Sequence, residues 1–137
     1  MSQWMKTQIK TLSNIESSYF EGAIDKMGYY ADFDQKKVTR SYEGDTQDVH
    51  CVLVHKDTGK SANIGLKFAA NQDGTVNMTV ICDWYYSKMS DKQFESQFTI
   101  AYNRCKIIDK AARQNFSVES EEVMADGRTM IVLTRAA

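Results

Sequence analysis

The sequence predicts an α+β fold: a mostly antiparallel sheet, built from a central three-stranded meander and a C-terminal hairpin, with two helices packed on one face. Apolar residues alternate with polar ones along several short runs, which is the period of a half-buried strand. In two other stretches they recur at intervals of three and four, which is the period of a helix. Turn-forming residues separate the strand-like runs, so neighbouring strands are expected to pair as hairpins.

Size and composition favour a single domain spanning residues 1–137. Of these residues 42% are hydrophobic and 26% are charged, as is typical of a soluble globular protein. A net charge of −1 gives no electrostatic reason to expect nucleic acid or an anionic membrane as a partner. The chain has no apolar run of membrane-spanning length and no signal-peptide core at its N-terminus. The expected location is therefore the cytoplasm, or the stroma of an organelle.

The N-terminal part should contain one strand and one helix. The strand is expected at Lys6–Leu12, and the spacing of Ser13 and Glu16 indicates a capping box at the start of the helix. Apolar residues then follow a helical period as far as Met27, and Gly28 is a natural stop because glycine adopts the left-handed conformation readily. Two further strands are expected at Tyr29–Phe33 and Lys36–Tyr42.

The middle of the chain predicts the meander. Its strands are expected at Val49–Lys56, Ala62–Ala70 and Thr75–Tyr85, joined by the turns KDTGK and NQDG. Alternation gives the last two strands one apolar face, which contains Ala62, Ile64, Leu66, Phe68, Val76, Met78, Val80, Cys82 and Trp84. The opposite face is wetter, with Asn63, Lys67, Thr75, Asn77, Thr79 and Asp83.

A second helix and a last hairpin complete the prediction. Ser90 and Gln93 have the spacing of a capping box, and an apolar stripe follows from Phe94 until the helix ends near Asn115. The closing hairpin is expected to pair two strands across the turn ADGR, at Phe116–Met124 and Thr129–Arg135.

Metal and cofactor chemistry is not predicted. The three cysteines, Cys51, Cys82 and Cys105, lie far apart at apolar positions, which favours buried, reduced thiols. His50 and His55 are five residues apart on one strand, so alternation places them on opposite faces. No nucleotide-binding glycine motif occurs either.

Several short motifs resemble the Ycf35 family, also known as the DUF1257 family, whose members occur in cyanobacteria, algal chloroplasts, other bacteria and phages. These motifs are KTQIK, MGYYAD, YEGD, IGLKF, DGTVNMTVICDWY and YNRCKIIDKAARQNFSVESEEVMADGRTMIVLTR. The resemblance covers nearly the whole chain, although members commonly begin Met-Ser-His and this chain has Gln3 in the third position. The family supplies no established activity. Its members are often encoded near AAA-type ATPases, so the resemblance suggests such an ATPase as a partner.

The predicted site lies at the end of the third meander strand. Asp83 is either a strand-end cap, bonded to local amides, or a ligand-binding carboxylate. Tyrosine suits a half-buried interface, and six aromatic residues are expected at element ends: Tyr29, Tyr30, Tyr42, Trp84, Tyr85 and Tyr86. Of these, Tyr42, Tyr85 and Tyr86 form the predicted rim with Asp83. The polar segment 41–48 is either a connector or a functional loop. The run Glu119–Glu122 is either a solvated edge strand or a docking patch for a basic partner.

Three classes of function are open at this point. The leading hypothesis is a non-enzymatic partner-binding or regulatory module that uses the wet face and the tyrosine rim, with a homo-oligomer as one form. A second is a nucleotide-like ligand binder, possible for a phage protein, in which the phosphate would meet Lys67, Arg40 and Arg104. A third is an enzyme that uses Asp83 with His50 or His55, which requires the fold to bring them together.

Overall fold

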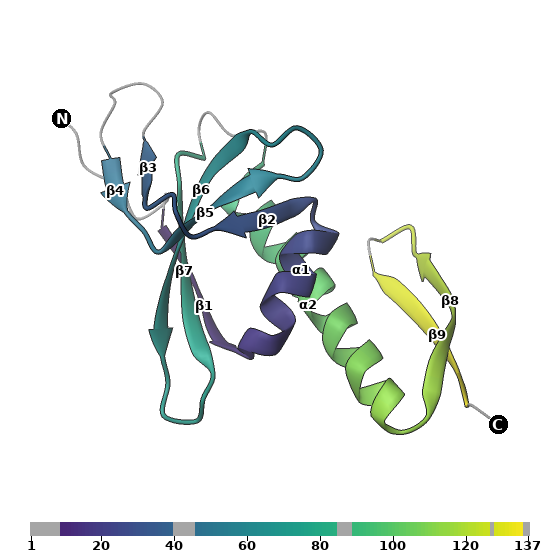
Figure 1. Ribbon diagram of the computed structural model, residues 1–137. Coiled ribbons are helices and arrows are strands. Elements are labelled where there is room, and N and C mark those ends of the chain that lie inside the picture. Colours follow the sequence, from purple (N-terminus) through teal and green to yellow (C-terminus); the bar gives the residue numbers. More distant parts are fainter. Residues whose placement is uncertain (1–8, 40–45, 85–88, 127, 136–137) are drawn as a thin grey trace.

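The computed structural model describes residues 9–39, 46–84, 89–126 and 128–135, and the fold is α+β as predicted (Figure 1). The strands are β1 (Ile9–Ile15), β2 (Tyr29–Asp32), β3 (Lys37–Thr39), β4 (Thr46–Asp48), β5 (Cys51–His55), β6 (Ser61–Ala70), β7 (Val76–Cys82), β8 (Phe116–Val123) and β9 (Thr129–Arg135). The helices are a 3₁₀ turn, η2 (Ser17–Tyr19), and the α-helices α1 (Phe20–Lys26) and α2 (Asp91–Arg113). None of these helices is both long and apolar enough to cross a membrane.

The predicted meander forms the centre of a five-stranded antiparallel sheet with the order β1-β7-β6-β5-β2. Gly59 and Gly74 lie in the two meander turns with φ of 71° and 88°, a conformation that glycine adopts without steric cost. β1 adds to the free edge of β7, and β2 adds to the free edge of β5. The sequence motifs thus place the local hairpins, while the two edge strands come from the N-terminal part of the chain.

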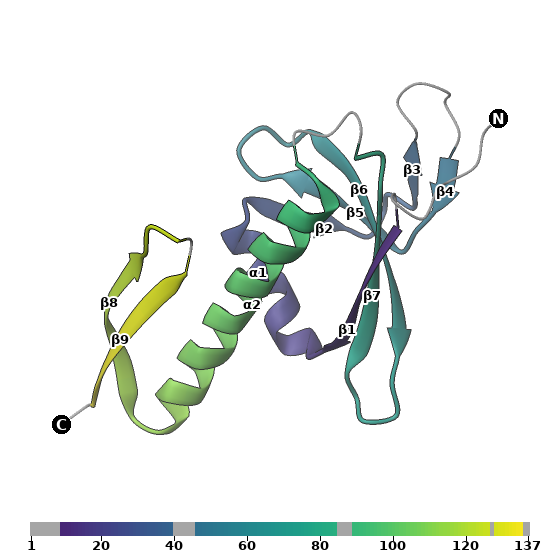
Figure 2. The ribbon, with the colours of Figure 1, turned by 180° about the vertical axis from the view of Figure 1, so that it is seen from behind.

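The main core lies between one face of this sheet and both helices. Leu66, Met78 and Val80 are fully buried there, against Phe94 and Phe98 of α2. The apolar face predicted for β6 and β7 is therefore confirmed. Figures 1 and 2 show α1 and α2 on the same side of the sheet, with α2 extending well beyond it.

The first helix begins later than predicted. β1 continues to Ile15, which pairs with Val76 after an irregularity in register, and α1 starts only at Phe20. The expected capping box of Ser13 and Glu16 is therefore wrong, because strand pairing overrides the local capping signal. The Glu16 carboxylate instead contacts the Lys106 ammonium of α2 at 2.9 Å.

The other helix signals are confirmed. Ser90 Oγ accepts a hydrogen bond from the Gln93 amide at 3.1 Å, and Gln93 Oε1 accepts one from the Ser90 amide at 2.9 Å. This reciprocal pair is the capping box that starts α2. Gly28 follows Met27, the residue that caps the end of α1, and has a φ of 92°, as expected for a helix stop.

The outer face of the sheet is less wet than predicted. The short hairpin of β3 and β4 covers part of it and creates a second small core from Val38, Val49, Val52 and Ile81. β3 lies within the predicted strand Lys36–Tyr42 but ends at Thr39. β4 lies at the end of the polar segment 41–48 and begins at Thr46. Residues 40–45 lie outside the described part of the chain.

The C-terminal hairpin is confirmed within one residue of the predicted bounds, but it does not join the central sheet. β8 and β9 form a two-stranded sheet of their own. Figure 1 shows this hairpin folding back alongside the projecting half of α2. β8 lies nearer to α2 than β9 does. The molecule therefore consists of a covered sheet, a long helix and a second, smaller sheet at the far side of that helix.

Candidate functional site

Only part of the predicted rim lies within the described residues. Asp83 follows β7 and is 7% exposed, so it is a buried carboxylate rather than one displayed on a wet surface. Trp84 is half-buried against Phe94, and its indole Nε1 has no hydrogen-bond partner within the described residues. Tyr42, Tyr85, Tyr86 and Arg40 lie outside the described residues.

His50 does not share a site with Asp83. Its Nδ1 accepts a hydrogen bond from the Phe68 amide at 2.8 Å, and the imidazole stacks on the Phe68 ring. Phe68 pairs with Met78, five residues before Asp83 on β7, which corresponds to about 16 Å along a strand. His55 is directed elsewhere, since its ring lies 5.2 Å from that of Tyr29. The geometry gives no support to an acid–base pair of Asp83 and His50.

Lys67 and Arg104, suggested as phosphate ligands, lie on separate parts of the molecule. Lys67 is on the outer side of β6, beside His50 and Thr79 at a shallow hollow. Arg104 is on the projecting part of α2 and binds Glu121 of β8. The structure therefore does not bring these two cations to one ligand.

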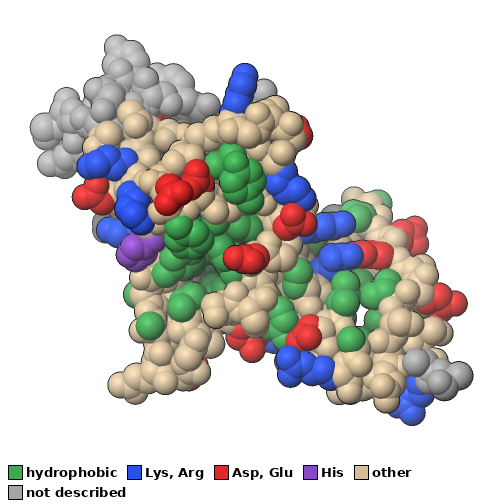
Figure 3. All heavy atoms as spheres, in the orientation of Figure 1, with side chains coloured by type: hydrophobic (Ala, Val, Ile, Leu, Met, Phe, Trp, Pro, Cys, Tyr) green, Lys and Arg blue, Asp and Glu red, His purple; other side chains and the backbone are tan. Residues whose placement is uncertain are grey.

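A hollow lies between the helices and the C-terminal hairpin, and we term it the hairpin groove. Its volume is about 450 Å³. Both helices and both strands of the hairpin contribute to its lining, which consists of Lys26, Met27, Gln97, Ile100, Ala101, Arg104, Glu121, Val123 and Thr129. Figure 3 shows basic and acidic side chains meeting between the main body and the hairpin, with hydrophobic side chains beside them.

One ion pair holds the hairpin across this groove. Arg104 Nε lies 2.6 Å from Glu121 Oε1. The guanidinium lowers the pKa of the Glu121 carboxyl, and the nearby ammonium of Lys26 adds to this effect. In return, the carboxylate raises the pKa of Arg104. Lys26 itself makes no ion pair or hydrogen bond with the described residues, so the groove carries one cation more than it has anions.

The apolar part of the groove is accessible. Ile100 is 41% exposed and Val123 is 71% exposed, although both are large hydrophobic side chains. Ile100 lies beside the stripe that packs on the sheet, and it is part of a second apolar side of α2 that also contains Ile107. The base of the groove is therefore apolar, and the basic side chains of Lys26 and Arg104 lie beside it.

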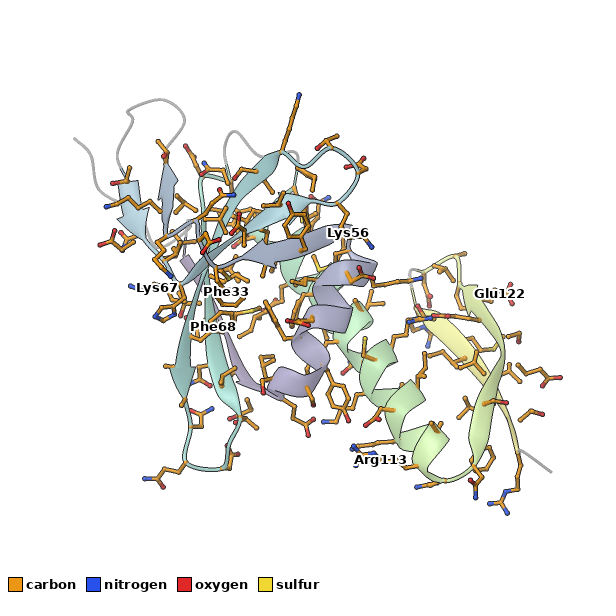
Figure 4. The ribbon with its side chains drawn as sticks, viewed as in Figure 1. Phe33, Lys56, Lys67, Phe68, Arg113 and Glu122 are labelled. Atoms are coloured by element: carbon orange, nitrogen blue, oxygen red, sulfur yellow. The ribbon has the colours of Figure 1, made fainter. Side chains whose placement is uncertain are left out.

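A second hollow, which we term the aromatic hollow, lies where α1 meets the end of β6. It measures about 380 Å³ and is lined by Ser17, Ser18, Phe20, Glu21, Phe33, Phe68 and Val76. Phe33 is 49% exposed. Figure 4 shows Phe33 and Phe68 together, with the Lys67 side chain in the same part of the view. Hydrophobic side chains gather over this region in Figure 3.

Neither hollow is predictable from the sequence, because each combines elements that are distant in the chain. The only local sign of the groove was Ile100 and Ile107, which extend the apolar surface of α2 beyond one stripe. The sign of the aromatic hollow was Phe33, a large apolar residue at the last position of the predicted strand Tyr29–Phe33.

All three cysteines lie in the described part of the chain. Cys51 and Cys82 are buried and Cys105 is half-buried, and none of the three forms a disulfide. Burial raises the pKa of the Cys51 thiol to about 11, so this thiol stays protonated and unreactive at neutral pH. Within the described ranges, no group of three His, Cys, Asp or Glu side chains could hold a metal ion.

Comparison with known proteins gives one result. No curated protein and no solved structure matches the chain. A family model described as a protein of unknown function, DUF1257, matches residues 23–132, which include the second half of α1, the meander, α2 and most of the hairpin. The chain belongs to the DUF1257 family.

Proposed function

We propose that this protein is a non-enzymatic binding module and that the hairpin groove receives a short segment of a protein partner. The observation that carries the proposal is the exposed apolar floor of the groove, Ile100 and Val123, beside two cations. Large apolar side chains that gather in an open hollow are typical of an interaction site.

The charges in the groove favour a partner segment with acidic side chains. Lys26 lies near enough to Glu121 to lower the pKa of that carboxyl but forms no salt bridge with a described residue, and Arg104 contacts Glu121 through its Nε. Within the described part of the chain the two terminal nitrogens of that guanidinium make no hydrogen bond, so they can bind a further carboxylate. An acidic segment could pair its carboxylates with Lys26 and Arg104. One or two of its apolar side chains could then pack on Ile100 and Val123.

The dimensions favour a segment rather than a folded domain. A volume of about 450 Å³ holds a few side chains, which fits an extended peptide or one exposed turn. An AAA-type ATPase is the candidate partner that the family resemblance suggests, and the proposed setting is the cytoplasm. Catalysis is not part of the proposal, because the described residues offer no assembled nucleophile and base.

A peptide-display selection against the purified chain tests this function. We expect enrichment of peptides that combine Asp or Glu with large apolar residues. Lys26→Glu should weaken their binding by about tenfold, or ~1.4 kcal/mol, because it reverses one groove charge. Lys92→Glu is the matched control, since Lys92 is an exposed lysine in the first turn of α2, away from the groove lining. Peptides that bind both variants equally would place the binding site elsewhere.

A second candidate function is the binding of a small planar ligand in the aromatic hollow. The observation that favours it is the half-exposed Phe33 ring beside Phe68. Lys67 lines the neighbouring hollow, which Phe68 also lines, and is the candidate cation for an anionic substituent. Native mass spectrometry of protein purified gently from its own source would reveal a bound molecule as extra mass that is lost on denaturation. Phe33→Ala should abolish that extra mass; a ligand retained by this variant would exclude the hollow.

A further inference from the structure

We propose that a second copy of this chain adds to the free edge of β9, so that two hairpins form one four-stranded antiparallel sheet across a two-fold axis. The inference rests on the backbone and side chains of β9 and does not depend on the hairpin groove. The proposed contact surface is the edge of β9 that does not pair with β8.

The edge of β9 offers unpaired backbone groups. Within the described part of the chain, β9 pairs with β8 alone. The Met124 amide donates to the Arg128 carbonyl at 2.7 Å, which fixes the direction of the backbone groups that follow. Because these groups alternate along a strand, Thr129, Ile131, Leu133 and Arg135 direct their amides and carbonyls to the free edge. A strand edge of this kind is completed by another strand.

The two edges of the hairpin differ in charge. β8 carries Glu119, Glu121 and Glu122, and acidic side chains on an edge strand oppose pairing with another copy. β9 has no charged residue from Thr129 to Thr134. Its flanking cations are already occupied, since Arg128 contacts Asp126 at 2.6 Å and Arg135 lies over the Phe116 ring. The hairpin therefore blocks one edge and leaves the other open.

The side chains of β9 are apolar on both faces. Met130 and Val132 on the outer face are 46% and 36% exposed, while Ile131 and Leu133 on the inner face are half-buried. An isolated two-stranded hairpin is at best marginally stable in water, and four strands with a shared apolar face are considerably more stable. Self-pairing would cover these side chains on both copies at once.

The sequence of β9 is self-complementary about Val132. With the two-fold axis at that residue, Val132 lies opposite its own copy, Ile131 opposite Leu133, and Met130 opposite Thr134. Each opposed pair shares a face, as the antiparallel arrangement requires, and no like charges meet. This register forms about eight backbone hydrogen bonds between the copies. These matches identify the occupant of the edge as a second copy of the chain.

Cysteine cross-linking tests the register. The two Val132 residues would form a non-hydrogen-bonded pair with Cα atoms about 4.5 Å apart, within the range of a disulfide. Val132→Cys should therefore give a covalent dimer under mild oxidation. Met130→Cys is the matched control, because its two copies would lie about 13 Å apart along the paired strands. Wild-type protein sets the background from the native thiols.

Solution size provides the second measurement. Sedimentation of the wild-type chain should show a monomer–dimer equilibrium over about a hundredfold range of concentration. Val132→Asp would place two carboxylates opposite each other and should shift this equilibrium to the monomer. Ser120→Asp, on the same outer face but on β8, should leave it unchanged. A wild-type monomer throughout that range, or equal cross-linking at positions 130 and 132, would overturn the proposal.

Discussion

Gly65, in the middle of β6, shows how one residue can set the spacing between two layers. An ideal Cβ at this position would lie 2.5 Å from Val49 Cγ1 and 2.7 Å from Val38 Cγ1. The side chain is absent because the β3–β4 hairpin packs directly on the strand. The sequence shows a glycine inside a predicted strand, and only the structure shows what approaches it.

Substitution of this glycine should therefore loosen the outer layer. We expect Gly65→Ala to lower the free energy of unfolding by about 1–3 kcal/mol, because two valine side chains must move. Urea unfolding measures this loss. Adding Val49→Ala should recover part of it by removing the nearest contact atom. A double variant that is destabilised by the sum of both changes would contradict this steric explanation.

Among the elements, α2 connects the two sheets, since its first half lies in the main core and its second half carries the hairpin. Both ends of this helix were predictable. The Ser90 capping box marks the start, and Asn115, with a φ of 63°, marks the turn into β8. The contact that fastens the hairpin was not predictable, because Arg104 and Glu121 are seventeen residues apart on different elements.

The fastening of the hairpin should depend on pH. The lowered pKa of Glu121 means that its stabilising effect is complete above the ordinary pKa of a glutamate. The effect is lost as the pH falls through the lowered pKa of the folded state. We expect about 1 kcal/mol or less of hairpin attachment to disappear under acid conditions. The methyl resonances of Val123 and Thr129, followed by NMR between neutral and acid pH, would report this change.

Two glutamate variants separate this effect from general acid unfolding. Glu121→Gln should remove the acid-dependent change and show weakened attachment at neutral pH. Glu122→Gln, on the opposite face of β8, should retain the wild-type pH profile. An identical profile in both variants would contradict the assigned role of the Arg104–Glu121 pair.

At the scale of the whole molecule, the sequence predicted the fold class and the elements whose signals are local. The meander, α2 and the last hairpin follow from alternation, capping and turn chemistry within short windows. The start of α1 was wrong because Ile15 pairs with Val76, a partner far away in the sequence. The hairpin groove and the aromatic hollow also depend on long-range packing. The predicted rim consists of Tyr42, Asp83, Tyr85 and Tyr86. Of these, only Asp83 lies within the described part of the chain, and it is buried.

The position of β1 at the edge of the central sheet has a consequence for the order of folding. Ile9 pairs with Ile81, so β1 reaches its neighbour only after a long loop has closed, whereas β5 and β6 each pair with the strand that follows directly. During synthesis the residues of β1 leave the ribosome well before those of β7. The first strand of the chain is therefore among the last to dock, and until then one edge of the nascent sheet is open to other chains.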